Sequence, residues 1–259
     1  MYRIPDAYAE IDPAKFSLDR APIYAVNGQS MEHKYDEAFL EHPLFTQNQL
    51  GTSGHIVCAL EKTGETEWFD AINLELVLQT LDKSHKEVLS ANISPQSAAQ
   101  PRFVQNVAAM LANYPKAAKR LKAELTEKGL GIADKDLYKF IDAVHRAGGK
   151  ILLDDYPRGR WKNTNVVSPI VGLSDGLKFS GRDVGAALRT PEKPPLAMMK
   201  QISAVVRANG KDVVLEGIRS AGNIATLKAA GIKFNYAQIA PDNAARRQKK
   251  SAAGEKPEA

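Results

Sequence analysis

The sequence predicts an α/β fold, a (β/α)8 barrel of the TIM type. Three observations lead to it: strand-like runs alternate with helical patterns, eight such runs fit into 259 residues, and polar residues recur where the runs end. An open doubly wound sheet is the competing fold, but neither common Gly-rich phosphate loop occurs in the sequence to support it. The runs are expected around 44–50, 56–60, 89–93, 121–125, 150–154, 175–179, 212–216 and 232–236.

The chain divides into three parts by composition. Residues 1–43 hold several prolines and little periodicity, so we expect an N-terminal extension that wraps on the domain or is partly loose. The domain itself is expected over 44–241, and its first two strands, joined by Gly51-Thr52-Ser53-Gly54, would form a hairpin. Residues 242–259 are basic and lack apolar periodicity, which predicts a disordered tail.

Composition restricts the class of protein. Hydrophobic residues make up 44% of the chain, enough for a substantial core, and the net charge of +5 is weak evidence for a nucleic-acid partner. A single cysteine excludes an internal disulfide framework and fits a reducing compartment. The sequence has no apolar run of membrane-spanning length, and its N-terminus lacks the apolar segment of a signal peptide. We therefore expect a cytoplasmic protein without membrane or nucleic-acid partners.

The most informative stretch is the run Lys150–Asp155, which reads as a buried strand ending in two adjacent carboxylates. Paired aspartates in such a place need a cation or a proton. Hard oxygen ligands suit Mg²⁺ or Mn²⁺ better than Zn²⁺, and two adjacent aspartates can contact two metal ions at once. The alternative is a metal-free rim in which a lysine pairs with the acids. The neighbouring strand-like runs end in Asn92, Glu124, Lys178 and Glu216.

Five short motifs, in order and with fitting separations, resemble those of the EAL domain family, which hydrolyses cyclic di-GMP to its linear dinucleotide. The motifs are Asn92-Ile93-Ser94, Glu124-Leu125-Thr126-Glu127, Asp154-Asp155-Tyr156, Asp175-Gly176-Leu177-Lys178 and Glu216-Gly217-Ile218. The resemblance implies a (β/α)8 barrel with its first strand reversed. It also implies homodimerisation near the loop that follows the paired aspartates.

The resemblance assigns roles to these residues. Asn92, Glu124 and Asp154 would bind one metal ion, and Asp154 with Asp155 would bridge to a second. Lys178 would position the attacking water, or act only as an ion-pair partner of the aspartates. Glu216 would serve as a base or a ligand, and Glu127 would brace the loop after Asp155.

Several positions depart from the family pattern. The signature Glu-Ala-Leu is expected at Cys58-Ala59-Leu60, which replaces a metal ligand by a thiol, and the phosphate-gripping Arg that follows becomes Lys62. The interval from Cys58 to Asn92 is short at 34 residues. The other departures are Tyr156-Pro157-Arg158-Gly159 in the loop after the aspartates, Arg219 in place of the last acid of its motif, and a missing Gln around Phe234 to Tyr236.

These departures predict a degenerate EAL-domain regulatory protein. It would have little or no phosphodiesterase activity and would act through an unknown protein partner; whether it binds cyclic di-GMP is left open. The alternative is a slow Mg²⁺- or Mn²⁺-dependent phosphodiesterase on the surviving residues. A third hypothesis is a receptor that binds the nucleotide without turnover.

Overall fold

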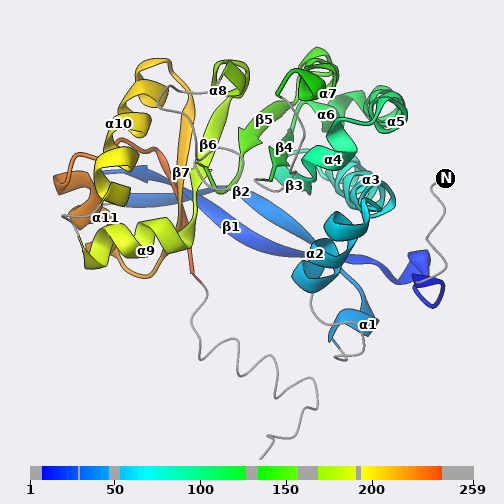
Figure 1. Ribbon diagram of the computed structural model, residues 1–259, viewed down its shortest axis with the longest axis horizontal. Helices are drawn as coiled ribbons and strands as arrows, with labels where there is room; N and C mark the ends of the chain where they lie inside the picture. The colour runs from blue at the N-terminus through cyan, green and yellow to red at the C-terminus, as the bar shows by residue number, and fades with distance from the viewer. Residues whose placement is uncertain are drawn as a thin grey trace, which may run out of the picture.

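The described part of the chain is a closed eight-stranded barrel with helices on its outside (Figure 1). The computed structural model describes residues 8–28, 30–46, 53–126, 134–156, 169–190 and 194–240. The first strand runs antiparallel to both of its neighbours, and every other neighbouring pair is parallel. The predicted barrel with a reversed first strand is confirmed. The strands are β1 (Ser17–Asn27), β2 (Ser30–Glu41), β3 (Leu89–Ile93), β4 (Leu121–Leu125), β5 (Lys150–Leu153), β6 (Gly176–Phe179), β7 (Asp212–Ile218) and β8 (Tyr236–Ile239).

The first two strands form a long hairpin within residues 17–41, in the stretch where the sequence analysis expected an extension. The strand predicted over 56–60 is wrong, because these residues lie in the helix α2 (Ser53–Thr63). Of the strand predicted over 44–50, the described residues 44–46 lie in the helix α1 (Pro43–Thr46), and the rest, with most of the predicted turn, lies outside the described residues. Ile56 and Leu60 are buried one helical turn apart and pack in a cluster with Phe45 and Trp68. A run of adjacent apolar residues therefore belonged to a short helix.

The remaining strand predictions agree with the structure more closely. The strands predicted over 89–93 and 121–125 are confirmed at both ends. Those predicted over 150–154, 175–179 and 212–216 each differ from the structure by one or two residues at one end. The last strand was placed too early, since β8 begins only at Tyr236. The helices after α2 are α3 (Glu67–Lys83), α4 (Pro95–Ala98), α5 (Pro101–Asn113), α6 (Pro115–Ala118), α7 (Asp134–Arg146), α8 (Pro169–Leu173), α9 (Gly181–Arg189), α10 (Pro194–Ala208) and α11 (Ala221–Ala229).

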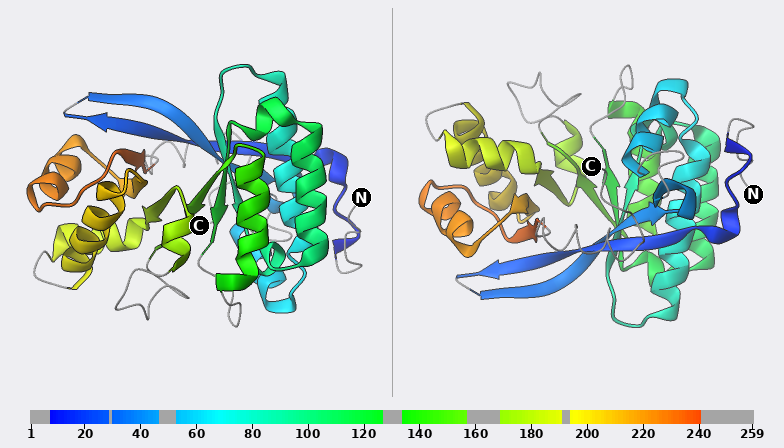
Figure 2. Two further views of the ribbon diagram at one scale, coloured as in Figure 1. Left: turned by 90° about the horizontal axis from the view of Figure 1, so that it is seen from above. Right: turned by 90° about the horizontal axis from the view of Figure 1, so that it is seen from below.

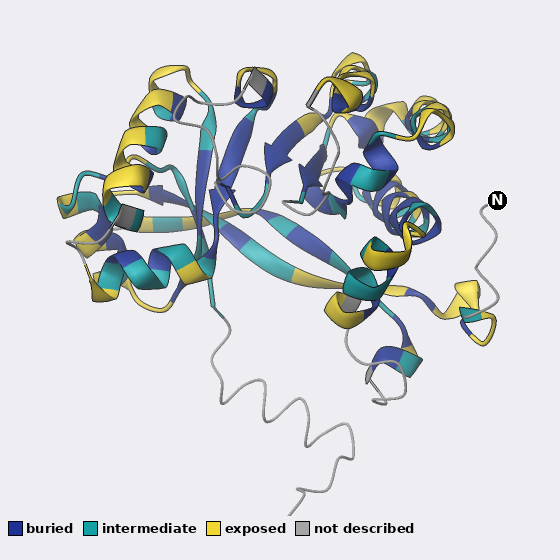
Figure 3. Ribbon diagram, viewed as in Figure 1, coloured by how far each residue is buried: buried dark blue, intermediate teal, exposed yellow. Residues whose placement is uncertain are grey.

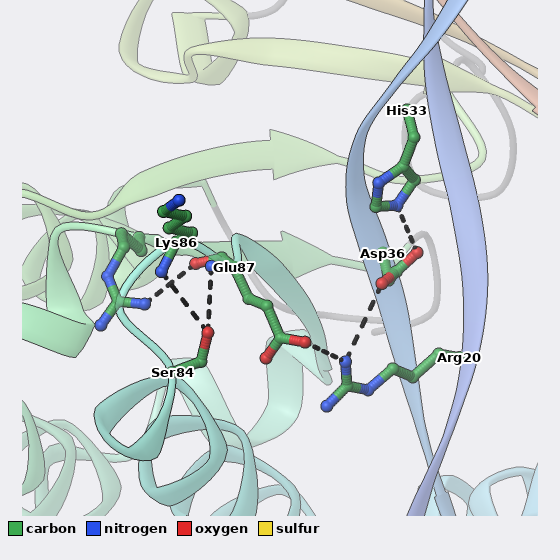
Figure 4. Close-up of polar contacts among 7 residues, drawn as sticks. Arg20, His33, Asp36, Ser84, Lys86 and Glu87 are labelled. Atoms are coloured by element: carbon green, nitrogen blue, oxygen red, sulfur yellow. Dashed lines mark hydrogen bonds and ion pairs between the residues drawn. The ribbon is translucent and has the colours of Figure 1, made fainter.

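The hairpin extends past the barrel, where its tip lies near α11 (Figure 2). Lys228 of α11 donates to the Gly28 carbonyl at 2.9 Å, which ties the tip to the body. Arg20 of β1 pairs with Glu87, in the connection before β3, at 2.9 Å (Figure 4). Residues 30–34 of β2 are mostly exposed, and buried residues occur only from Tyr35 on, so the strand as a whole lacks the strict alternation of a half-buried strand.

Side chains fill the barrel interior in layers contributed by alternate strands, as in other TIM barrels. At the amino-terminal end the Lys122 ammonium lies 4.1 Å from the ring centre of Tyr35 and 5.1 Å from that of Tyr236. Gly176 belongs to the same level, and a Cβ there would lie 2.5 Å from the Asp212 carbonyl oxygen. Ile23, Leu152 and Val214 form the next cluster. The following level, toward the carboxyl ends of the strands, is polar.

The outward-facing residues of the strands pack against the helices and form the main core. The burial map shows this as a buried centre surrounded by partly exposed helices (Figure 3). On β3, Leu89, Ala91 and Ile93 belong to this outer core, as do Ala123 and Leu125 on β4. The intervening residues of both strands therefore face the interior, which positions Asn92 and Glu124 at the carboxyl-terminal end.

Candidate metal and catalytic site

A single lysine lies at the centre of the polar level. The Lys178 ammonium is 2.6 Å from Glu124, 2.7 Å from Glu216, 2.9 Å from Glu37 and 3.3 Å from Asp154, and the side chain is 0% exposed. These acids come from β4, β7, β2 and the end of β5, and Lys178 lies on β6, so five strands contribute to one cluster. The structure thus brings together Glu124, Asp154, Lys178 and Glu216, as the sequence predicted.

Glu37 is the member of this cluster that sequence reasoning missed. Asn92 Nδ2 donates to Glu37 Oε1 at 2.9 Å, and Gln238 Nε2 donates to Glu37 Oε2 at 2.8 Å. Lys178 donates to the same Oε2 at 2.9 Å. The signal that could have found this residue is the sequence Glu37-Ala38-Phe39, which differs from Glu-Ala-Leu only in its last letter. The carboxylate on the strand beside Asn92 is therefore Glu37.

The proposed substitution of the signature glutamate by Cys58 is wrong. Cys58 lies on α2, outside the barrel strands, and is only partly buried. Measured from Glu37, the interval to Asn92 is 55 residues and not 34. Lys62 was aligned by the same reasoning, and it is an exposed residue of the same helix. Both departures came from reading a helix as a strand.

The missing Gln is also present. Gln238 lies on β8, two residues beyond the segment in which it was sought, because the last strand begins later than predicted. Gln238 fixes the carboxylate of Glu37 from the side opposite to Asn92, so Glu37 accepts bonds at both oxygens.

Glu216 is held in place by a backbone irregularity. The pairing of β7 with β8 shifts between Leu215 and Ile218, and Gly217 adopts a φ of 67°. A Cβ on Gly217 would lie 2.8 Å from the Gly181 Cα, so a side chain there would clash with backbone. Asp155 is the one non-glycine residue among those described with positive φ, at 48°. Such backbone is tolerated by aspartate and is frequent at functional sites.

Burial raises the pKa of two of the carboxyl groups strongly. The pKa of Glu124 rises to about 8 because burial, and then the neighbouring Glu37, oppose its ionisation. The pKa of Glu216 also rises to about 8, through burial, although Lys178 acts in the opposite direction. Burial opposes the charge of Glu37 too, but Lys178, Asn92 and Gln238 hold its pKa below the usual value. The single ammonium of Lys178 cannot neutralise the four carboxylates around it.

The residues fit a divalent metal ion by their chemistry and position. Asp154, Asp155 and Glu216 can each offer a carboxylate oxygen, and these oxygens lie within 4.8 Å of one another. Glu124 Oε1 is buried and has no hydrogen-bond partner among the described residues. Hard oxygen donors of this kind bind Mg²⁺ or Mn²⁺, and a bound cation would supply the missing positive charge.

Some predicted positions lie outside the described residues. These are Glu127, the segment 157–168 that includes Pro157, Arg158 and Gly159, and the C-terminal tail. Their predicted roles stay predictions.

The family model for the EAL domain matches residues 37–235 of this chain. The chain belongs to the EAL domain family. The match begins at Glu37, the residue that geometry places in the cluster. No curated protein matches the sequence.

Solved structures of EAL proteins share the fold. An S helix-GGDEF-EAL chain of Vibrio cholerae LapD, bound to c-di-GMP, is 19% identical with a TM-score of 0.72, covering 88% of this chain and 53% of its own. The PaMucR phosphodiesterase in complex with c-di-GMP is 20% identical, with a TM-score of 0.70 and coverages of 87% and 94%. The Xanthomonas citri FimX EAL domain in complex with c-di-GMP is 18% identical, with a TM-score of 0.67 and coverages of 87% and 86%. This chain therefore spans about half of the LapD chain and most of the other two.

None of the helices in the described residues combines the length and apolar character that a membrane crossing requires.

Proposed function

We propose that this EAL domain is a Mg²⁺- or Mn²⁺-dependent phosphodiesterase that acts on cyclic di-GMP. The observation that carries the proposal is the position of Glu37, which contacts Asn92, Lys178 and Gln238 in one cluster. Sequence reasoning predicted a degenerate protein with little or no activity from three losses together: a carboxylate ligand, the loop after the aspartates and part of the pocket. With Glu37 in place, the carboxylate is not lost, and the interval to Asn92 is not short.

The side chains divide the work as follows. Glu37, Asn92, Glu124, Asp154 and Asp155 would hold the metal, which, when bound, supplies a water of lowered pKa and positive charge beside the phosphate. Lys178, which reaches four carboxylates, would donate to the attacking water and hold it in place. Glu216, whose carboxylate lies 2.7 Å from the Lys178 ammonium, would accept a proton from that water.

Purified protein incubated with cyclic di-GMP and Mn²⁺ tests the proposal. We expect the linear dinucleotide to form in molar excess over the protein, and Asp154→Ala to abolish its formation. Cys58→Ser is the matched control, since Cys58 lies on α2 outside the cluster, and it should leave the rate unchanged. Turnover that survives in Asp154→Ala would point to a contaminant, and no turnover in the wild type would refute the proposal.

The second candidate is a degenerate regulator that binds cyclic di-GMP without hydrolysis and acts through protein contacts or a homodimer. Two observations favour it. If Glu37 is the signature residue, the position of the family's phosphate-gripping Arg falls on Glu41, whose charge would repel a phosphate. In addition, the Lys178 ammonium already pairs with Glu124 at 2.6 Å and would have to share that carboxylate with a metal.

Calorimetry with cyclic di-GMP separates the two candidates. Saturable binding without product in the presence of Mn²⁺ supports the regulator, and binding with product supports the enzyme. Glu41→Arg should strengthen nucleotide binding in either case, because it restores a cation at the mouth of the barrel. Unchanged binding by this variant would show that Glu41 does not face the nucleotide.

A further inference from the structure

Three buried polar atoms inside the barrel have no hydrogen-bond partner among the described residues. They are the Tyr35 hydroxyl, Ser90 Oγ and Glu124 Oε1. Tyr35 is 2% exposed, and Ser90 and Glu124 are 0% exposed, so bulk solvent does not reach them. Buried polar atoms in native proteins almost always have a partner, either protein or ordered water.

The three atoms belong to neighbouring strands and to one region of the interior. Ser90 on β3 is in register with Glu37 on one side and with Lys122 on the other. Tyr35 precedes Glu37 by two residues and Glu124 follows Lys122 by two, so all of them face inward by the alternation of a strand. Tyr35 and Ser90 therefore lie beneath Glu124, which belongs to the metal-binding level itself.

Other contacts place the Tyr35 side chain near Glu124. The Lys122 ammonium, on the same strand as Glu124, stands 4.1 Å from the centre of the Tyr35 ring. The Tyr35 ring therefore lies beside β4, the strand that carries Glu124.

We propose that one buried water molecule is shared by the Tyr35 hydroxyl, Ser90 Oγ and Glu124 Oε1. With the Glu124 carboxylate ionised, as it is when a metal ion is bound, the Tyr35 hydroxyl would donate to the water, and the water would donate to Glu124 Oε1 and to Ser90 Oγ. Three polar partners are the usual number for a buried water. Lys178 already donates to Glu124 Oε2 at 2.6 Å, so the water would fix the second oxygen of the same carboxylate.

This arrangement makes Tyr35 and Ser90 positioning residues for Glu124. Their importance for metal binding rests on the proposed function, in which Glu124 is a metal ligand. Residues that orient a ligand without touching the metal commonly change metal affinity by about 10- to 100-fold when they are replaced. Tyr35→Phe removes only the hydroxyl and keeps the ring under Lys122.

A high-resolution crystal structure tests the water directly. We expect a peak within hydrogen-bond distance of all three atoms in the wild type and its loss in Tyr35→Phe. A wild-type structure in which the three side chains contact each other, or enclose no water, would overturn the inference.

Thermal unfolding provides a second test, because the two cases predict opposite changes in the melting temperature. If the hydroxyl bonds a water, Tyr35→Phe and Ser90→Ala lower the melting temperature; if the hydroxyls are unpaired, their removal raises it. Tyr236→Phe is the matched control, because Tyr236 shares the aromatic level but is only half-buried, and it should change the melting temperature little.

Mn²⁺ titration measures the positioning role. We expect Tyr35→Phe to weaken Mn²⁺ binding about 10-fold and Tyr236→Phe to leave it unchanged. Unchanged affinity in Tyr35→Phe, with the water present in the wild type, would refute the positioning role. A wild type that binds no Mn²⁺ would instead refute the proposed function, and the crystallographic test would still decide on the water.

Discussion

Two buried lysines occupy the two ends of the barrel interior, and their surroundings differ. Lys178, at the carboxyl-terminal end, lies within 3.3 Å of four carboxylates. Lys122, at the amino-terminal end, lies between two tyrosine rings and pairs with Asp212 at 3.4 Å. Burial opposes the charge of both, yet the carboxylates raise the pKa of Lys178, whereas the pKa of Lys122 is lowered.

The difference separates a carboxylate-rich end of the barrel from an end where the charges are nearly balanced. At the amino-terminal end, one acid and two aromatic faces accommodate one cation, so the charges nearly balance. At the carboxyl-terminal end, several carboxylates share one ammonium, and burial raises the pKa of Glu124 and Glu216 to about 8. An excess of buried negative charge of this kind favours a bound metal ion.

Replacing Lys178 should have the largest effect. In metal-free protein we expect Lys178→Met to lower the free energy of unfolding by about 3–5 kcal/mol, because the carboxylates lose their buried partner. Urea unfolding at neutral pH measures the loss, and added Mn²⁺ should recover part of it. A loss below about 1 kcal/mol would contradict the central role given to this lysine.

Asp70, on α3, is a buried acid outside the barrel interior. No ion pair of Asp70 is seen among the described residues, in contrast to the acids around Lys178. It accepts from the Ser94 N–H at 2.9 Å, and burial raises its pKa to about 7. The folded state therefore holds a proton that the unfolded chain releases above its usual pKa of 3.8. The contribution of Asp70 to stability is greatest below that value and falls as the pH rises to about 7.

Asp70→Asn should remove this dependence. The fall in unfolding free energy between pH 4 and 7 should be smaller in the variant by up to about 4 kcal/mol, since one pKa unit corresponds to about 1.4 kcal/mol. Urea unfolding of both proteins across that range measures it. Parallel curves for the two proteins would show that Asp70 is ionised in the folded state.

Replacing Lys122 should have a smaller effect than replacing Lys178. Lys122→Met keeps an apolar chain between the tyrosine rings, and Asp212 retains its hydrogen bond from Asn235 at 2.8 Å. We expect a loss of about 1–2 kcal/mol in unfolding free energy and no change in Mn²⁺ affinity. Weaker Mn²⁺ binding in this variant would mean that the two ends of the barrel are not independent.

Much of the site could be predicted because its residues end strands with simple patterns. The motif residues Asn92, Glu124, Asp154 and Glu216 follow short apolar runs, and parallel strands bring their carboxyl ends to one face of a barrel. The alternation of helix and strand was likewise sufficient for the fold class.

The errors have a common physical origin at the two edges of the parallel sheet. Glu37 lies on a strand of the hairpin, and residues 30–34 of β2 are mostly exposed, so the pattern of the whole strand is not that of a buried strand. The sequence Cys58-Ala59-Leu60 matches the last two residues of the Glu-Ala-Leu signature. The buried Ile56 and Leu60, however, are four residues apart, which is a helical spacing. Gln238 was missed because Ile232 closes the turn after α11, where its N–H donates to the Leu227 carbonyl, and does not begin the strand.

Mn²⁺ binding by Glu37→Gln and Cys58→Ser, compared with the wild type, tests the central claim most directly. Glutamine keeps the size of Glu37 but removes its charge, while Cys58 lies on α2 outside the cluster. We predict that Glu37→Gln weakens Mn²⁺ binding at least 10-fold and that Cys58→Ser binds as the wild type does. The reverse result, with binding lost in Cys58→Ser and kept in Glu37→Gln, would contradict the assignment of Glu37 as the carboxylate that completes the site.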